Sequence, residues 1–173
     1  VGVTLGEDRE RALLKIKRFT ACPEYSFTLP KFTADFRPVV VGFGPAGMFA
    51  ALSLAEAGAN PIVLERGLPV EERARRIDTF NRLGILDTEC NVQFGEGGAG
   101  TFSDGKLNTG VNNPRIGWIL EQMVKAGARE EILFDAKPHV GTDVLLTVVQ
   151  NIRQRILSLG GEIRFNSHVV DLQ

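Results

Sequence analysis

A glycine-rich turn between two apolar segments restricts the fold of this chain more than any other feature. The β-branched run Val39–Val41 leads into the turn Gly42–Gly47, and an alanine-rich segment follows as far as Gly58. This order predicts a strand, a tight turn and a helix over 45–57. A second apolar run at 61–64 predicts the next strand. Together they make a β-α-β unit whose parallel strands are buried on both faces.

The spacing of the glycines is typical of a turn that binds a dinucleotide. Gly42 allows the tight turn, Gly44 lets a pyrophosphate approach the backbone, and Gly47 lets the helix pack closely on the strand. The helix N-terminus offers free N–H groups and a partial positive charge to the phosphates. Glu65, at the end of the second strand, can accept both hydrogen bonds from an adenosine ribose diol. Its charge would repel a 2′-phosphate, so NADP is not expected here, while FAD and NAD stay as alternatives.

A second glycine-rich segment, 91–110, predicts a long loop of the kind that often carries function. Its glycines permit positive φ angles and a close approach to a ligand. Its polar side chains suit a flat heterocycle and phosphate, and they are Gln93, Thr101, Ser103, Lys106 and Asn108. The alternative interpretation is a mobile surface loop.

The rest of the chain continues the α/β pattern. Helices are expected at 10–19, 70–83 and 114–126, and another begins at a cap formed by Thr142 or Asp143. That helix presents one apolar face, composed of Leu145, Val148, Val149, Ile152 and Ile156. Strands are expected at 162–165 and 168–172, and the segment 22–36, with two prolines, predicts an extended linker.

Composition excludes several classes of function. The net charge is −1, so there is no general basic field to attract nucleic acid or an anionic membrane. The uncharged run 38–55 is divided by glycines and a proline, so we expect no membrane span there, and we expect no secretory signal at the N-terminus. Cys22 and Cys90 are far apart, which predicts free thiols in a reducing, cytoplasmic compartment and no metal site. We expect a small-molecule substrate as the partner.

Four stretches, 37–47, 63–67, 91–109 and 137–143, resemble the uncharacterised FAD-dependent dehydrogenase family of the glutathione-reductase-like flavoproteins. The resemblance implies a Rossmann-like FAD/NAD(P)-binding α/β domain over 37–173, after a peripheral segment at 1–36. We expect that domain to be incomplete at its C-terminus and the chain to be a fragment. NAD(P)H is one candidate for the electron donor. The cysteine pair of the disulfide reductases is missing, so that thiol chemistry is not expected.

The same resemblance implies FAD held in extended form. The turn would contact the pyrophosphate, Glu65 the adenosine ribose, residues of 93–106 the pyrophosphate, ribityl chain or flavin, and the backbone of Val169 the adenine. The expected FAD ligands are Gly42, Phe43, Gly44, Pro45, Ala46, Gly47, Glu65, Arg66, Arg73, Gln93, Gly97, Gly98, Ala99, Thr101, Phe102, Ser103, Lys106 and Val169.

No catalytic residue is assigned. His139 could act as an acid or base, but we favour the interpretation that it orders the turn before the 142–158 helix. His168, Arg75 and Arg76 are expected on the surface.

Three functions follow from these patterns. The leading hypothesis is an FAD-dependent oxidoreductase that transfers hydride to or from an unknown substrate. The second is an NAD-binding dehydrogenase without flavin. The third is a non-catalytic nucleotide-binding or interaction module, whose basic N-terminal stretch at 9–18 binds a partner or RNA, although a solvated helix face is the usual explanation for such charges.

Overall fold

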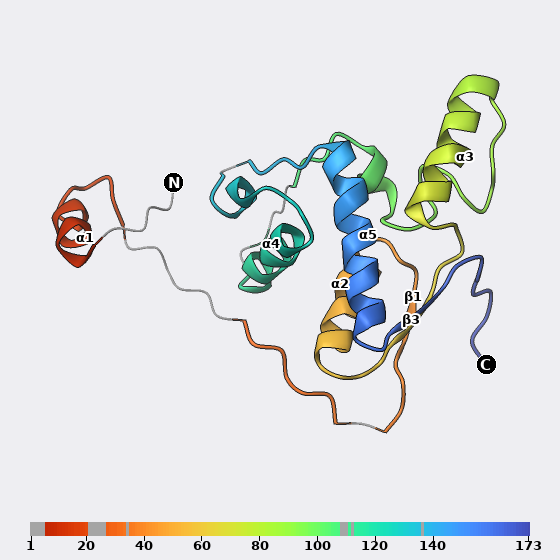
Figure 1. Ribbon diagram of the computed structural model, residues 1–173, viewed down its shortest axis with the longest axis horizontal. Coiled ribbons are helices and arrows are strands. Elements are labelled where there is room, and N and C mark those ends of the chain that lie inside the picture. Colours follow the sequence, from red (N-terminus) through yellow and green to blue (C-terminus); the bar gives the residue numbers. More distant parts are fainter. Residues whose placement is uncertain (1–5, 21–26, 34, 108–110, 112, 136) are drawn as a thin grey trace.

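The computed structural model describes residues 6–20, 27–33, 35–107, 111, 113–135 and 137–173 (Figure 1). Cys22 and Asn108, which the sequence analysis considered, lie outside this part. Within it the chain is a mixed α/β structure around a three-stranded parallel sheet of order β1-β2-β3. The strands are β1 (Val39–Val41), β2 (Ile62–Leu64) and β3 (Glu162–Arg164). The predictions of these three strands are therefore confirmed.

Helices connect and cover the strands. In chain order the helices are α1 (Glu7–Leu14), α2 (Pro45–Glu56), α3 (Val70–Leu83), α4 (Arg115–Lys125) and α5 (Thr142–Ser158), with short 3-10 helices η1 (Ala99–Phe102) and η2 (Glu130–Leu133). The helix predicted at 70–83 is confirmed to the residue. The helix predicted at 10–19 begins and ends earlier, as α1. Part of the 91–110 segment, predicted as a loop, forms η1.

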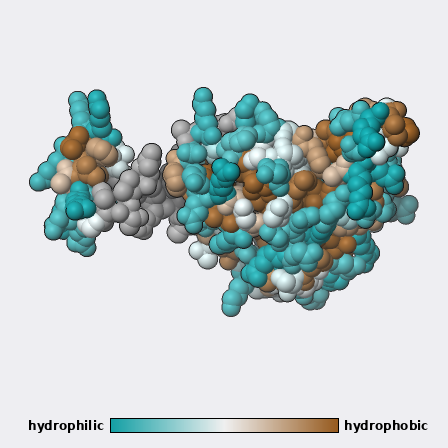
Figure 2. Space-filling model, turned by 45° about the horizontal axis from the view of Figure 1, so that its top comes forward, coloured by the Kyte–Doolittle hydropathy of each residue, from teal (hydrophilic) through white to brown (hydrophobic). Residues whose placement is uncertain are grey.

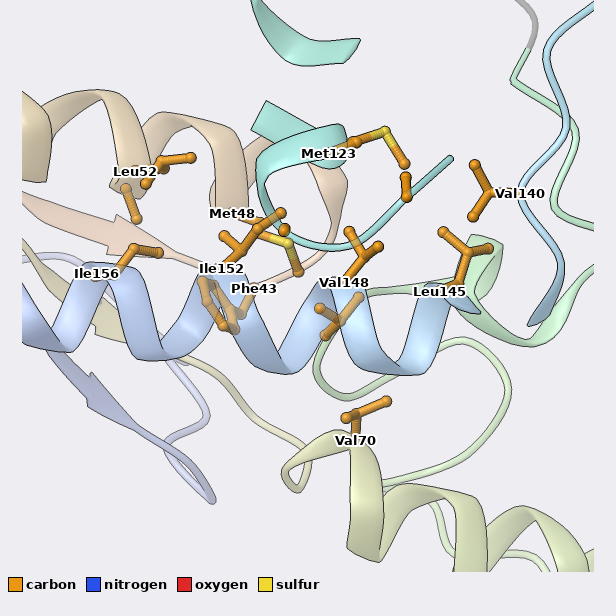
Figure 3. Packing of buried hydrophobic residues seen from close by; sticks show 14 of the residues in the cluster. Phe43, Met48, Leu52, Val70, Met123, Val140, Leu145, Val148, Ile152 and Ile156 are labelled. Carbon is orange, nitrogen blue, oxygen red and sulfur yellow. The ribbon is translucent and has the colours of Figure 1, made fainter. Parts of the chain in front are cut away.

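The core lies where α5 packs along α2 beside the sheet (Figures 1 and 3). The five buried residues of α5 are the five that the helical period predicts: Leu145, Val148, Val149, Ile152 and Ile156. Their partners include Phe43, Met48 and Leu52, which come from the turn and from α2 (Figure 3). Burial of such a side chain stabilises a fold by roughly 1.5–3 kcal/mol. This packing fixes the N-terminal end of α2, which forms part of the site described below.

Two predictions about the strands were wrong: that β1 is buried on both faces, and that 168–172 forms a strand. β1 is not buried on both faces, because Val39 and Val41 are 56% and 59% exposed. The sheet order leaves one edge of β1 without a neighbouring strand among the described residues. The segment 168–172 is no strand, and Val170 and Leu172 are almost fully exposed. An apolar alternation forms a strand only where a neighbouring strand can take its hydrogen bonds.

The cap of α5 also differs from the prediction. Gly141 is the N-cap residue, and no side chain caps the helix among the described residues. The hydroxyl of Thr142 instead donates to the carbonyl of Ser103 at 2.9 Å. The N-terminus of α5 is thereby tied to the second glycine-rich segment, directly after η1.

The N-terminal part and the tip of α3 lie at the periphery. α1 buries none of its residues and stands apart from the remainder of the chain (Figure 1). Figure 2 shows apolar surface over the far end of α3, where Phe80, Leu83, Ile85 and Leu86 are exposed. Among the described residues, no helix has both the length and the apolar character that crossing a bilayer requires.

Candidate functional site

The turn after β1 brings backbone and helix into close contact. The N–H of Gly42 donates to the carbonyl of Leu64 at 2.8 Å, which joins the turn to the end of β2. A Cβ on Gly47 would lie 2.0 Å from the oxygen of Gly42, so only glycine fits there. A Cβ on Gly44 would meet Gly98 at an ordinary 3.8 Å. The protein itself therefore has room for a Cβ at Gly44. The glycine leaves this part of the backbone open to a ligand that approaches from solvent.

Glu65 joins three segments through backbone N–H groups. Its buried carboxylate accepts from Phe43 N at 2.6 Å on one oxygen, and from Gly67 N at 2.8 Å and Gly95 N at 3.1 Å on the other. A carboxylate has about four acceptor positions. Among the described residues three donors occupy it, which leaves one position for a ligand. Glu65 can thus take one ribose hydroxyl without giving up a bond, rather than the two that the sequence predicted.

Arg73 lies inside the second glycine-rich segment instead of facing a phosphate. Its side chain is fully buried, and its guanidinium lies 4.7 Å from the ring centre of Phe102. It donates four hydrogen bonds of 2.6–2.9 Å, all to backbone carbonyls of the segment: Asn91, Val92, Glu96 and Gly98. These bonds give Arg73 the task of shaping the segment, and we leave it out of the ligands proposed below. Sequence reasoning missed this role because an arginine on a helix gives no sign of which carbonyls will surround it.

Glu96 is a second buried ionisable residue in the same segment. Its Oε2 accepts from Val70 N and from the guanidinium of Arg153, both at 2.7 Å. Its Oε1 is buried without a hydrogen-bond partner among the described residues. Burial raises the pKa of Glu96 to about 7. Arg153 also pairs with Glu71 of α3.

A cavity of about 360 Å³, which we call the turn pocket, opens between the first turn and the second glycine-rich segment. It gathers seven of the predicted site residues: Gly42, Gly44, Glu65, Arg66, Gln93, Gly98 and Val169. Phe94 and His168 also line it and were not predicted. The guanidinium of Arg66 stacks 4.0 Å above the ring of Phe94 and binds Glu89 at 3.0 Å. The pocket thus has a flat, cationic wall next to a buried carboxylate.

A neighbouring cavity of about 520 Å³, the helix pocket, lies between α2, η1, α4 and α5. Six predicted residues line it, namely Pro45, Ala46, Gly97, Thr101, Ser103 and Lys106. Most of its remaining walls are apolar side chains such as Phe49, Ile119 and Val148. A Cβ on Gly98 would lie 2.8 Å from Cδ of Pro45, so the two glycine-rich segments touch where the two pockets adjoin.

The other predicted residues support this arrangement from outside the two pockets' walls. Phe43 is in the core and contributes its backbone N–H to Glu65. Ala99 and Phe102 belong to η1.

The backbone of His139 pairs with Lys106 in an isolated antiparallel bridge, and the side chain of His139 is exposed. Lys106 itself is exposed and forms an ion pair with Asp104 at 2.7 Å.

Comparisons with known proteins match the chain to parts of longer proteins. The chain is 57% identical, over 131 residues or 76% of its length, to an uncharacterised protein of Clostridium beijerinckii, of which the match covers 25%. It is 32% identical, over 80 residues or 40% of its length, to a protein of Emericella nidulans named FAD-dependent monooxygenase apdD, of which the match covers 12%. No family model matches the chain. The chain therefore spans a quarter or less of these relatives and has partial similarity to an FAD-dependent enzyme.

Proposed function

We propose that this chain is the FAD-binding part of a flavin-dependent oxidoreductase, with a Rossmann-like domain over residues 37–173. The observation that carries the proposal is the turn pocket, because four separate segments expected to bind a dinucleotide meet at it. They are the turn after β1, the end of β2, the second glycine-rich segment and the stretch around Val169. The partial similarity to a protein named as an FAD-dependent monooxygenase supports the same cofactor.

The turn pocket fits the adenosine diphosphate half of FAD. The first turn of α2 has N–H groups without partners inside the helix, and the dipole of the helix favours phosphate there. The absent side chain of Gly44 leaves room for the pyrophosphate. Glu65 has one acceptor position for a ribose hydroxyl, and the Arg66–Phe94 stack offers a flat wall to the adenine.

The helix pocket fits the flavin half. Its volume of about 520 Å³ is in the ordinary range for a ligand site, and its apolar walls suit the ring system. Thr101, Ser103 and Lys106 supply polar groups on one side. When bound, the flavin would supply hydride transfer, and the chain would bind it, orient it and exclude water. The proposal extends to a small-molecule substrate, with NAD(P)H as electron donor.

Substitution of Gly44 by alanine tests the proposal. Gly44 has φ −74°, a conformation that alanine adopts, and the added Cβ makes only ordinary contact with the protein. The variant should fold normally yet lose FAD, because the methyl group occupies the approach of the pyrophosphate. Flavin binding is measured by titrating the protein with FAD and following the flavin absorbance at about 450 nm.

Gly117→Ala is the matched control, since a Cβ there meets nothing within 4 Å. We expect Gly117→Ala to bind FAD like the wild type and Gly44→Ala to bind at least about 10-fold more weakly, a loss of about 1.4 kcal/mol. A wild-type chain that binds no FAD, or a Gly44→Ala variant with unchanged affinity, contradicts the proposal. NAD binding in place of FAD would favour a dehydrogenase without flavin.

A further inference from the structure

Glu96 stands in a short stretch of backbone rich in glycine. Its neighbours Gly95, Gly97 and Gly98 have φ angles of +116°, +84° and +66°, values that glycine adopts without the strain that a Cβ would bring. The N–H groups of this stretch donate from Gly95 to Glu65, from Glu96 to Leu68 O and from Gly97 to Phe43 O, and Arg73 donates to the carbonyls of Glu96 and Gly98. For the stretch to move away from the turn, these bonds must break together with those that the Glu96 carboxylate accepts from Val70 N and Arg153.

The closed position places the carboxylate of Glu96 where ionisation is costly. The side chain is fully buried, and Oε1 finds no donor within the described part of the chain. An unpartnered oxygen costs more free energy when it carries negative charge than when the group is neutral. A carboxyl group in this position therefore keeps its proton to a higher pH than one in water for as long as the stretch is closed.

The charges around Glu96 come from three directions. Arg153 faces it from α5, Glu71 and Arg73 from α3, and Glu65 from the end of β2. Arg153 is shared, because it also pairs with Glu71. Burial raises the pKa of Glu96, Glu71 and Glu65 add to the rise, and Arg153 and the N–H of Val70 oppose it, with the result near 7.

We propose that Glu96 is a positioning residue, which closes the second glycine-rich segment over the turn pocket by taking up a proton. On opening, the carboxylic acid reaches solvent and releases that proton to water; on closing, the carboxylate takes one back. Gly95 and Gly98 line the turn pocket, so closing completes its wall. The statement that this wall holds FAD depends on the proposed function, whereas the proton-linked closing does not.

Hydrogen exchange of backbone amides tests the closing in the absence of any ligand. The quantity measured is the protection of the Gly97 amide, its exchange rate relative to an unstructured chain, between pH 5 and pH 8. Because the open form ionises near 4.5 and the closed form near 7, protection should fall by up to about 10-fold per pH unit up to pH 7 and then stay level. In Glu96→Gln, which cannot ionise, the protection should be independent of pH.

Two references make the result specific. Glu72→Gln changes an exposed carboxylate on α3 and should keep the wild-type profile. The amide of Ile152, in the middle of α5, reports unfolding of the whole chain, and it should be better protected than Gly97 at every pH. A flat wild-type profile, a slope that persists in Glu96→Gln, or equal protection at Gly97 and Ile152 would each overturn the proposal. The wild-type profile decides the matter even if Glu96→Gln fails to fold.

The cofactor part has a separate readout. FAD added to the wild type should increase the protection of Gly97, because a ligand that binds the closed form shifts the equilibrium towards it. Absence of FAD binding at every pH would contradict the proposed function and this part of the inference together, while the ligand-free exchange profile would still decide whether Glu96 closes the segment. FAD binding without any added protection would contradict only the claim that the closed wall holds it.

Discussion

Arg73→Lys should destabilise the chain although it preserves the charge. The guanidinium donates to four carbonyls at 2.6–2.9 Å in a fully buried position. A lysine ammonium has three donors at a single point and cannot reproduce the spread of the guanidinium. At least one carbonyl loses its partner, and a hydrogen bond to a charged group contributes about 1.5–3 kcal/mol. We therefore expect the free energy of unfolding to fall by about 3 kcal/mol.

The loss can be measured by urea unfolding, followed by circular dichroism and by the fluorescence of Trp118, the single tryptophan. Arg75→Lys is the control, because Arg75 is exposed on the same helix and such substitutions stay within about 0.5 kcal/mol. Arg73→Met removes all four bonds and should cost more than Arg73→Lys. If Arg73→Lys unfolds within about 0.5 kcal/mol of the wild type, the four bonds do not hold the segment as argued here.

Three further predictions concern stability. Burial raises the pKa of Glu96 from 4.5 to about 7, so the free energy of unfolding should fall by about 3 kcal/mol as the pH rises between these values and should level off above pH 7. Urea midpoints at pH 5 and pH 8 measure this fall, and equal midpoints would refute it. Gly47→Ala should cost at least about 1–3 kcal/mol in the same assay, because its Cβ would overlap the oxygen of Gly42, and near-wild-type stability would show that the turn relaxes. Ile156→Ala should lower stability by about 2–5 kcal/mol and Leu157→Ala, its half-exposed neighbour, by clearly less; equal losses would contradict the assigned face of α5.

The parts of the fold that could be predicted are those that depend on nearby residues. The apolar face of α5 repeats with the helical period, so Val148, Ile152 and Ile156 reveal their burial in the sequence alone. The turn at Gly42–Gly47 is equally local, since strand, glycines and helix follow one another directly. Glu65 and Gly98, which the resemblance to a flavoprotein family places among the ligands of one cofactor, lie at one pocket.

The parts that could not be predicted depend on segments distant in the chain. Arg73 and Glu96 are both polar residues that a sequence assigns to the surface or to a ligand. Their burial follows from the return of the second glycine-rich segment across α3, which no periodicity reports. Val39 and Val41 have the residue types of a central strand, but their exposure depends on what covers the face of β1 to which both point. The element that covers this face is determined by residues elsewhere in the chain, so the strand's own residues do not reveal it.

The way in which Arg73 holds its segment has a consequence for how that segment can change. The guanidinium contacts carbonyl oxygens, and every amino acid carries one. The side chain of Val92 can therefore vary without loss of the anchor, as long as the path of the backbone stays the same. One buried cation therefore preserves the outline of the pocket through backbone contacts. Side chains along its rim can then be exchanged for others that bind a different molecule.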